Sequence, residues 1–484
     1  MELFYTERMK KVILFFTFAL AIFLIVFRFT STPKVWIDEG LFTEIARNVA
    51  FHGVWGIQTD PGEYSLMNVS QVSVSYPVIL PVALSLKIFG IGIWQARLPM
   101  IVYMFILVVL FYLFVKKRFG FYSAILSVLL LLTFSPFYGD GRSVLGEVPG
   151  LVFLVFGALM LLLLEEGGFR SKKWAILGGL AFGLAAATKG IYLLGVSSAL
   201  FIVLIFWFKQ IKDKKILLTF LYGFIPPVLI WAYIHLISSN SLLDFIPNIL
   251  YLASNHSVSI PLYQTILNNF ARFFTETTPI LFLFMFVVIA TSFFFRYFKI
   301  KSKDFSIAEC VVLFFIILNW VGYLGGTGWY RYFFPAHTLL YLFFPGAVYV
   351  LAKYITNIFL KRVLLIIPVA LIIFQFYHMI FLSDTSLIHK RTRNDDLSTA
   401  LSKIDPSKKV FFDNLAEAVI FLKGDNYSQY FYCDGCFLEG GNKDSLYDQS
   451  FDYILTGQIS QDFSLPNYDR QSVDRYYLFK KISK

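Results

Sequence analysis

Val35-Trp36-Ile37-Asp38-Glu39-Gly40 directly follows the first hydrophobic segment and places two adjacent carboxylates just beyond it. After this stretch, apolar residues recur at helical spacing, at Leu41, Phe42, Ile45, Ala46 and Val49. The pattern predicts an amphipathic helix that lies in the membrane interface, with Asp38 and Glu39 at its N-terminus. A simpler alternative is that Asp38 is an ordinary N-cap, whose carboxylate accepts hydrogen bonds from backbone N–H groups.

The composition indicates a polytopic membrane protein. Of the 484 residues, 57% are hydrophobic and 19% aromatic, which is far from the usage of soluble domains. The net charge of +11 does not indicate nucleic-acid binding, because the cations gather in short loops between apolar segments and no base-reading motif is present. We therefore expect membrane lipids, and no nucleic acid, as partners. The sequence also lacks a Walker loop and a dinucleotide fingerprint.

Eleven apolar stretches approach the roughly 20 residues that a helix needs to cross a bilayer. They are Val12–Phe29, Leu98–Val115, Tyr122–Phe137, Val148–Leu164, Trp174–Ala187, Ile191–Phe208, Ile216–Ile237, Ile280–Phe295, Ile307–Leu324, Phe333–Leu351 and Val363–Leu382. Tyr76–Phe89 is apolar as well, but it is short and contains Pro77 near its start. We expect it to form an interfacial or re-entrant helix.

Lysine and arginine predict the orientation in the cell membrane, plasma or inner. With the N-terminus in the cytoplasm, each inner loop holds a basic cluster: Arg8, Lys10 and Lys11; Lys116, Lys117 and Arg118; Arg170, Lys172 and Lys173; Lys209, Lys212, Lys214 and Lys215; Arg296, Lys299, Lys301 and Lys303; and Lys353, Lys361 and Arg362. The first outer loop (residues 30–97, with Asp38 and Glu39), the loop Ser238–Pro279 and the tail from Ser383 then lie outside.

The tail, residues 383–484, differs in composition from the membrane part, residues 1–382, and predicts a small extracytoplasmic α/β domain. Strands are expected at Lys409–Phe412, Ser428–Cys433, Phe451–Leu455 and Tyr476–Phe479, and a helix at Leu415–Leu422. Cys433 and Cys436 lie in this domain. A disulfide or two free thiols is favoured over zinc, because one CxxC supplies only two of four zinc ligands. A thioredoxin-like redox role is a weaker alternative.

Ionisable and aromatic residues stand at the outer ends of the spans. They are Arg97, Asp140, Arg142, Glu147, Lys189, Arg272, Tyr330 and Arg331. Arg97 and Arg272 fit interfacial anchors, because long cationic side chains reach the headgroups from a span end. Lys189, with almost no polar neighbours, and Arg331, among aromatic residues, favour a functional role. Carboxylates and cations at one interface suit a reaction in which one partner is an anionic lipid.

Six short motifs follow one another along the chain: Trp36-Ile37-Asp38-Glu39, Tyr76-Pro77 with Leu80-Pro81, Phe89-Gly90 with Arg97-Leu98-Pro99, Arg142 with Glu147, Thr188-Lys189, and Arg331-Tyr332 with Pro335. In this order they resemble glycosyltransferase family 39 and its relatives, the protein O-mannosyltransferases and the lipid A aminoarabinose transferases. The resemblance covers roughly Lys11–Leu382. It implies the GT-C membrane fold, and the aminoarabinose transferases also carry a soluble domain after the last span.

Enzymes of this kind move a sugar from a polyprenyl-phosphate carrier to an acceptor hydroxyl, with inversion, on the outer face of the membrane. The resemblance implies that Asp38 is the general base that takes the acceptor proton. It implies that Glu39 and Glu147 orient the acceptor or the sugar. If a divalent cation is used, Asp38, Glu39 and Glu147 would be its ligands.

The same resemblance implies that Lys189 and Arg331 bind the carrier phosphate, whose negative charge grows as it leaves. Second choices for that role are Tyr330, Arg142 and Arg97. The expected partners are a polyprenyl-phosphate-linked sugar and an acceptor that is a lipid, a glycan or a protein.

The chain departs from the family pattern at three places, one of which is the polar loop between Gly53 and Ser75. The Lys-Pro-Pro-Leu common in the first outer loop reads here as Ser75-Tyr76-Pro77-Val78, so a lysine contact is missing or supplied elsewhere. Glu147 stands where aspartate is commoner. Two other functions remain: a ligase or oligosaccharyltransferase-like enzyme that moves a whole glycan, and a transporter or flippase for lipid-linked sugars. A transporter should show repeated halves and polar groups near mid-membrane, whereas the polar groups here stand at the outer rim.

Overall fold

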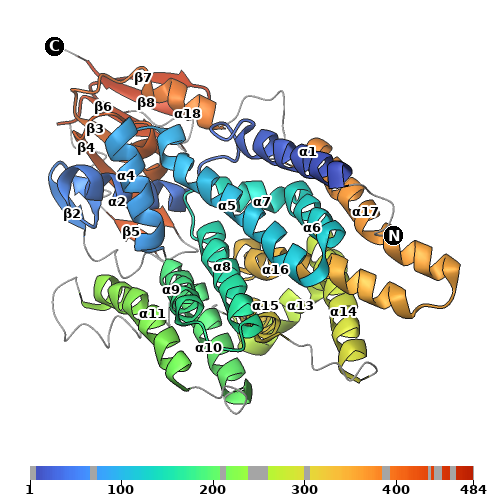
Figure 1. Ribbon diagram of the computed structural model, residues 1–484. Helices are drawn as coiled ribbons and strands as arrows, with labels where there is room; N and C mark the ends of the chain where they lie inside the picture. Colours follow the sequence, from blue (N-terminus) through green and yellow to red (C-terminus); the bar gives the residue numbers. More distant parts are fainter. Residues whose placement is uncertain are drawn as a thin grey trace.

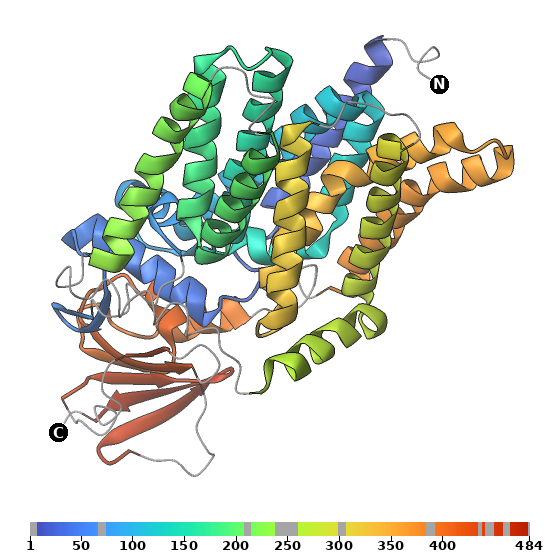
Figure 2. The same cartoon turned by 90° about the horizontal axis from the view of Figure 1, so that it is seen from below.

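A helical bundle with a small sheet at one end makes up the computed structural model (Figures 1 and 2). The described residues are 7–65, 74–207, 214–237, 260–298, 306–383, 393–433, 438–440, 450–457 and 465–482. The start of the first helix and the C-terminal sheet lie at opposite ends of the bundle (Figure 2).

Each of the eleven expected apolar stretches overlaps a helix, although Phe208, the end of the sixth, lies outside the described residues. The helices are α1 (Glu7–Val26), α5 (Ile93–Phe119), α6 (Phe121–Thr133) followed by α7 (Ser135–Arg142), α8 (Glu147–Glu166), α9 (Lys172–Thr188), α10 (Gly190–Trp207), α11 (Lys214–Ala232) continued by the π-helical turn η2 (Tyr233–Ile237), α14 (Thr277–Phe298), α15 (Ile307–Gly325), α16 (Tyr330–Tyr354) and α17 (Ile358–Phe381). In the part of the chain that the structure describes, the protein is therefore a multi-pass α-helical membrane protein.

Full-length spans are fewer than the eleven expected. Among the described residues, eight helices are long and apolar enough to cross a membrane, and α6 with α7 makes a ninth if this pair, bent by 67°, is one span. The bend follows from Ser135-Pro136, because proline favours the start of a new helix and cannot continue the old one. The helix α9 has 17 residues, and the apolar part of α10 is Gly190–Ile205, so both are shorter than a full span.

Two helices lie between the bundle and the sheet (Figure 1). They are α2 (Ile37–His52) and α4 (Tyr76–Phe89), and a short hairpin of β1 (Ile57–Asp60) and β2 (Glu63–Ser65) follows α2. The expected short helix after Ser75 is thus present as α4. The position of α2 differs from the expectation, because its apolar residues pack against α4 and the C-terminal domain rather than against lipid.

The C-terminal part contains α18 (Arg393–Leu401) and a six-stranded mixed sheet in the order β5-β4-β3-β6-β8-β7. The four expected strands are present as β3 (Val410–Asp413), β4 (Tyr427–Cys433), β6 (Tyr453–Thr456) and β8 (Tyr476–Lys481), and two unexpected ones are β5 (Leu438–Gly440) and β7 (Tyr468–Val473). The expected helix after β3 is a 3₁₀ helix, η5 (Ala416–Ile420). Strand β3 pairs parallel with β4 and β6, and the outer pairs are antiparallel.

Buried polar side chains of α2 join it to the C-terminal domain. Arg47 donates to the carbonyl oxygens of Val419, Leu422 and Gly424 and pairs with Asp425. Because the Arg47 side chain is almost fully buried, these partners are needed to offset its desolvation.

The carboxylate of Glu44 lies beside this arginine in the same interface. It accepts hydrogen bonds from the backbone N–H of Gln58 (2.9 Å), the hydroxyl of Tyr427 (2.8 Å) and Nε2 of Gln429 (2.8 Å). Burial raises the pKa of Glu44 to about 7, although these donors and Arg47 act in the opposite direction. Glu44 and Arg47 therefore fix the second half of α2 to the domain.

Gly40 permits the closest approach between α2 and the C-terminal domain. A Cβ atom at this position would lie 2.6 Å from the backbone carbon of Ala416 and from the backbone nitrogen of Glu417. Backbone atoms cannot rotate away, so any side chain at residue 40 would push α2 off η5.

We predict that Gly40→Ala lowers the free energy of unfolding by about 1–3 kcal/mol, the usual cost of overpacking a core. The measurement is the thermal melting temperature of purified full-length protein in detergent. Gly322→Ala in α15 is the matched control, because a Cβ there would meet nothing within 4 Å. Equal melting temperatures for the two variants would contradict the close contact at Gly40.

Candidate functional site

Three buried polar side chains fix the connection between α1 and α2. Arg142 of α7 donates to the carbonyl oxygens of Leu24 (2.7 Å), Phe27 (2.8 Å) and Thr32 (3.3 Å). The carbonyls of Leu24 and Phe27 lie at the C-terminal end of α1, where a helix leaves its last acceptors unpaired and favours a cation. Arg142 therefore holds the end of α1.

Asn394 of α18 and Arg97 of α5 bind the rest of this connection. The Asn394 amide donates to the carbonyl oxygens of Thr30, Ser31 and Pro33, and its oxygen accepts from the N–H of Val35 at 2.7 Å. The guanidinium of Arg97 donates to the carbonyl oxygens of Phe29 (2.7 Å) and Pro33 (3.0 Å). The backbone that enters α2 is thus anchored from three separate helices.

Glu39 forms a fully buried, bidentate ion pair with Arg97. Nε and Nη2 of Arg97 each lie 2.8 Å from one carboxylate oxygen of Glu39, and both side chains have 0% exposure. The same carboxylate accepts from the N–H of Val144 at 3.2 Å. Glu39 and Arg97 are enclosed in the protein, so neither side chain is accessible to solvent. Arg97 is not at the protein surface, where a headgroup anchor would lie.

Asp38 points to a different partner, Arg331 at the start of α16, with which it forms an ion pair. The two side chains are 12% and 20% exposed, whereas the Glu39–Arg97 pair is fully enclosed. Trp36, not Asp38, is the N-cap of α2, and Asp38 lies in the first turn. The N-cap alternative for Asp38 is therefore wrong, because its carboxylate pairs with a cation from another helix.

Glu147 at the start of α8 and Lys189 at the end of α9 form a second, buried ion pair. Lys189 also forms a β-bridge with Val74, and the N–H of Ser75 donates to the carbonyl oxygen of Thr188 at 3.1 Å. The residues that replace the lysine-containing motif of the first outer loop therefore lie directly beside Lys189.

Tyr332, which the sequence did not identify as a site residue, lies between the two cations. Lys189 Nζ is 5.5 Å and Arg331 Cζ is 5.1 Å from the centre of its ring. The Arg331 guanidinium also lies over the ring of Trp329, with Cζ 4.7 Å from its centre. Cations over aromatic faces are held in place while their donors remain available to an anion. In the sequence, the only indication of this contact is that Tyr332 directly follows Arg331.

Nε of Arg331 and Oε2 of Glu147 are buried and have no hydrogen-bond partner among the described residues. Asp140 of α7, which is partly buried, lies close enough to Glu147, Lys189 and Arg331 for their charges to act on it. The N-termini of α2, α8 and α16 meet at these residues, and helix N-termini favour anions. The arrangement suits the binding of a phosphate beside a carboxylate that can accept a proton.

Tyr330 and the two cysteines are placed differently. The hydroxyl of Tyr330 lies 3.0 Å from Nδ1 of the buried His337, so it points along α16 rather than toward Lys189. The side chain of Cys433, and Cys436 altogether, lie outside the described residues. Their disulfide therefore stays a prediction.

The proposed metal ligands do not form a metal site in this arrangement. Asp38, Glu39 and Glu147 each pair with a different cationic side chain, and no group of three His, Cys, Asp or Glu residues suited to a metal occurs among the described residues. Ca²⁺ and Mg²⁺ are bound by about six or more oxygen ligands in a defined geometry. The described carboxylates do not converge on one point, so as placed they do not form such a site.

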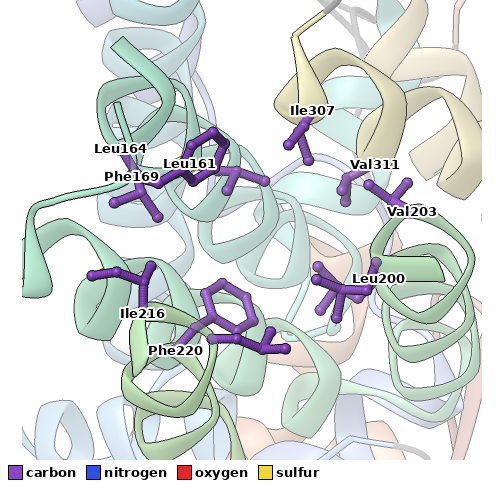
Figure 3. Close-up of a pocket in the computed structure, with 11 residues that line it drawn as sticks. Leu161, Leu164, Phe169, Leu200, Val203, Ile216, Phe220, Ile307 and Val311 are labelled. Atoms are coloured by element: carbon purple, nitrogen blue, oxygen red, sulfur yellow. The ribbon is translucent and has the colours of Figure 1, made fainter. Parts of the chain in front are cut away.

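An apolar cavity of ≈ 40 Å³ lies at the other end of α8 from Glu147 (Figure 3). Its lining is entirely hydrophobic and comes from α8, α10, α11 and α15 and the segment after α8: Leu161, Leu164, Phe169, Leu200, Val203, Leu204, Ile216, Leu217, Phe220, Ile307 and Val311. With no polar group to orient a ligand, the cavity offers no chemistry of its own.

Comparison with known proteins agrees with the resemblance seen in the sequence. The sequence model of the dolichyl-phosphate-mannose-protein mannosyltransferase family matches residues 78–231. No curated protein matches the chain. Among solved structures, ArnT from Cupriavidus metallidurans bound to undecaprenyl phosphate aligns with a TM-score of 0.61 at 13% identity, over 97% of this chain and 98% of that one.

The oligosaccharyltransferase of Archaeoglobus fulgidus in its apo form aligns with a TM-score of 0.57 at 11% identity, over 88% of this chain. This chain covers 65% of the length of that enzyme. The expected architecture, a GT-C-like membrane fold with a small C-terminal α/β domain, is therefore confirmed.

Neutralising the two adjacent carboxylates should lower stability by different amounts. Glu39→Gln leaves Arg97 as an uncompensated buried charge, so we expect it to lower the free energy of unfolding by about 3–5 kcal/mol. Asp38→Asn is the matched control and should cost clearly less, because its pair is partly exposed and water can reach the arginine that is left. Thermal melts of both variants in one detergent test this. Similar melting temperatures, or a larger loss in Asp38→Asn, would refute the division of roles.

Proposed function

We propose that this protein is an inverting glycosyltransferase that moves a sugar from a polyprenyl-phosphate carrier to an acceptor hydroxyl. The single observation that carries the proposal is the pairing of Asp38 with Arg331 at the junction of three helix N-termini. The GT-C fold and the match to a mannosyltransferase family support it. The fold neighbour bound to undecaprenyl phosphate makes a lipid phosphate the natural donor class.

Arg331 and Lys189 are the proposed phosphate ligands. Both are cations held against the ring of Tyr332, and the helix N-termini around them add positive potential. As the phosphate leaves the sugar its charge grows, so these groups stabilise the transition state more than the bound donor. Lys189 lies beside Ser75, which stands where the family motif has a lysine, so one cation remains at this place.

Asp38 is the proposed general base. Without a donor it is paired with Arg331; an incoming phosphate competes for the guanidinium and leaves the Asp38 carboxylate ready for the acceptor. The acceptor oxygen attacks the anomeric carbon, the carbon–oxygen bond to the phosphate breaks with its electron pair staying on the phosphate, and the acceptor proton passes to Asp38. Attack opposite the leaving group inverts the anomeric centre.

The remaining site residues are proposed to position Asp38, Lys189 and Arg331. Glu147 holds Lys189 and keeps one carboxylate oxygen for the sugar or acceptor. Glu39, Arg97 and Arg142 set the first turn of α2 from inside the protein. Asp140 lies near both cations and is a further candidate for the sugar hydroxyls.

The orientation is proposed with the N-terminus in the cytoplasm of a cell or inner membrane and the site on the outer face. Basic clusters at the inner loops support this orientation. The placement of α1's start and the C-terminal domain at opposite ends of the bundle is compatible with it (Figure 2).

The test is sugar transfer by purified protein in lipid nanodiscs, with a radiolabelled polyprenyl-phosphate sugar. We expect Asp38→Asn to be folded and to transfer sugar about 10²–10⁴-fold more slowly, because asparagine cannot accept the proton. Asp60→Asn, on the β1–β2 hairpin, is the matched control and should be near wild type. Wild-type protein that releases no label from any such donor would overturn the proposed function.

Arg331 supplies a second, separable test in the same assay. Arg331→Lys keeps the charge but loses the planar fork, so it should retain part of the transfer rate, whereas Arg331→Ala should lose far more. If both variants transfer sugar at the wild-type rate, Arg331 does not contact the phosphate.

A further inference from the structure

Helix α13 (Leu262–Thr275) has three distinct faces, although the sequence did not identify it as an element. One face, about 100° wide at 100° per residue, is apolar and exposed: Tyr263 (68%), Ile266 (38%), Leu267 (61%), Phe270 (44%) and Phe274 (61%). A second face is exposed and polar, with Gln264, Asn268 and Thr275. A third, with Thr265, Asn269 and Phe273, is buried against the protein.

The buried face holds the segment that leads to Arg331. Nδ2 of Asn269 lies 3.2 Å, 3.1 Å and 2.9 Å from the carbonyl oxygens of Tyr323, Leu324 and Gly326. Arg272 donates to the carbonyl oxygen of Gly328. These carbonyls lie at the end of α15 and in the turn before Trp329 and Arg331, so α13 supplies the partners that this backbone requires.

Gly328 shows how closely the turn is seated on α13. Its φ is +71°, a conformation that favours glycine. A Cβ atom there would collide with Oδ1 of Asn269 and lie 3.0 Å from Nη1 of Arg272. The turn therefore has no room to move toward α13, and its position follows that of the helix.

The apolar face of α13 continues the lipid-facing surface of the bundle. Helix α13 lies crosswise at the end of α14, on the same end of the bundle as the C-terminal domain (Figure 2). Helix α14, a candidate membrane span, starts two residues after α13 and exposes Ile280, Phe284 and Val287. An amphipathic helix next to the end of a span places its apolar face among the lipid headgroups and upper acyl chains.

We infer that α13 is a membrane-interface helix whose partner is the lipid bilayer, and that Asn269 is a positioning residue that couples this contact to Arg331. The second half of the inference rests on the proposed function, in which Arg331 binds the carrier phosphate. The bilayer fixes the depth of α13, the Asn269 and Arg272 bonds fix the turn, and the turn sets the start of α16. The phosphate ligand is thereby held at the level of the headgroups, where a lipid phosphate lies.

The location of α13 is tested by fluorescence quenching in nanodiscs of phosphatidylcholine and phosphatidylglycerol. In a background of Cys310→Ser, Cys433→Ser and Cys436→Ser, the variants Phe270→Cys and Asn268→Cys are each labelled with bimane. Phe270→Cys should be quenched by brominated acyl chains and protected from aqueous iodide, and Asn268→Cys should show the reverse. Iodide quenching of both sites would overturn the inference. Protection of Phe270→Cys from both quenchers would also overturn it, because a protein would then cover the face.

The positioning role is tested by the Kd for undecaprenyl phosphate in the same nanodiscs. Asn269→Asp replaces the donor to three carbonyl oxygens by an acceptor of equal size, so the Kd should rise about 10-fold. Asn268→Asp makes the same change on the water-facing side and should leave the Kd unchanged. A Kd for Asn269→Asp equal to wild type would overturn the positioning role. Wild-type protein that binds the lipid but transfers no sugar would instead refute the proposed function. The quenching pattern and the Kd values would still test the place of α13 and the role of Asn269.

Discussion

The structure of the site depends on one buried ion pair, Glu39 with Arg97. Consecutive residues of a helix point about 100° apart, so two adjacent carboxylates cannot share one environment. Glu39 is enclosed with its arginine, and the same arginine binds the backbone that enters α2. These contacts of Arg97 fix the first turn of α2. Asp38, which points in a different direction from Glu39, then pairs with Arg331. The second half of α2 is fixed by Arg47 to the C-terminal domain, which thereby becomes part of the support of the site.

With the first turn fixed, the proposed exchange of partners at the partly exposed pair of Asp38 and Arg331 requires side-chain movement only. In the proposed reaction, a phosphate that binds Arg331 takes the place of the Asp38 carboxylate, so the arginine charge stays paired. Lys189 is already neutralised by Glu147 and shares the ring of Tyr332 with Arg331. The site is thus preorganised for an anion, which is the condition for electrostatic stabilisation of a leaving phosphate.

The sequence predicts the helices well, because long apolar runs and Lys/Arg clusters are local signals, as for Phe333–Leu351 within α16. It also predicts four strands of the sheet, but it misses β7, whose mixed polar pattern fits an edge strand. The division of labour between Asp38 and Glu39 depends on Arg97, which lies 58 residues away and whose pairing no local pattern reveals. Likewise α2 looks like a lipid-facing helix, because its covering partners, α4 and η5, are distant in sequence. Tyr332 and α13 were missed because aromatic residues near a membrane have several common roles.

The central claim, that phosphate displaces Asp38 from Arg331, is tested most directly by the affinity for undecaprenyl phosphate without any sugar. Wild type, Asp38→Asn and Arg331→Ala would be compared in nanodiscs of one lipid composition. The account predicts that Asp38→Asn binds about 2- to 5-fold more tightly than wild type, because a partly exposed ion pair no longer competes, and that Arg331→Ala binds more weakly. If Asp38→Asn weakens binding as much as Arg331→Ala does, the two residues do not exchange partners and the account is wrong.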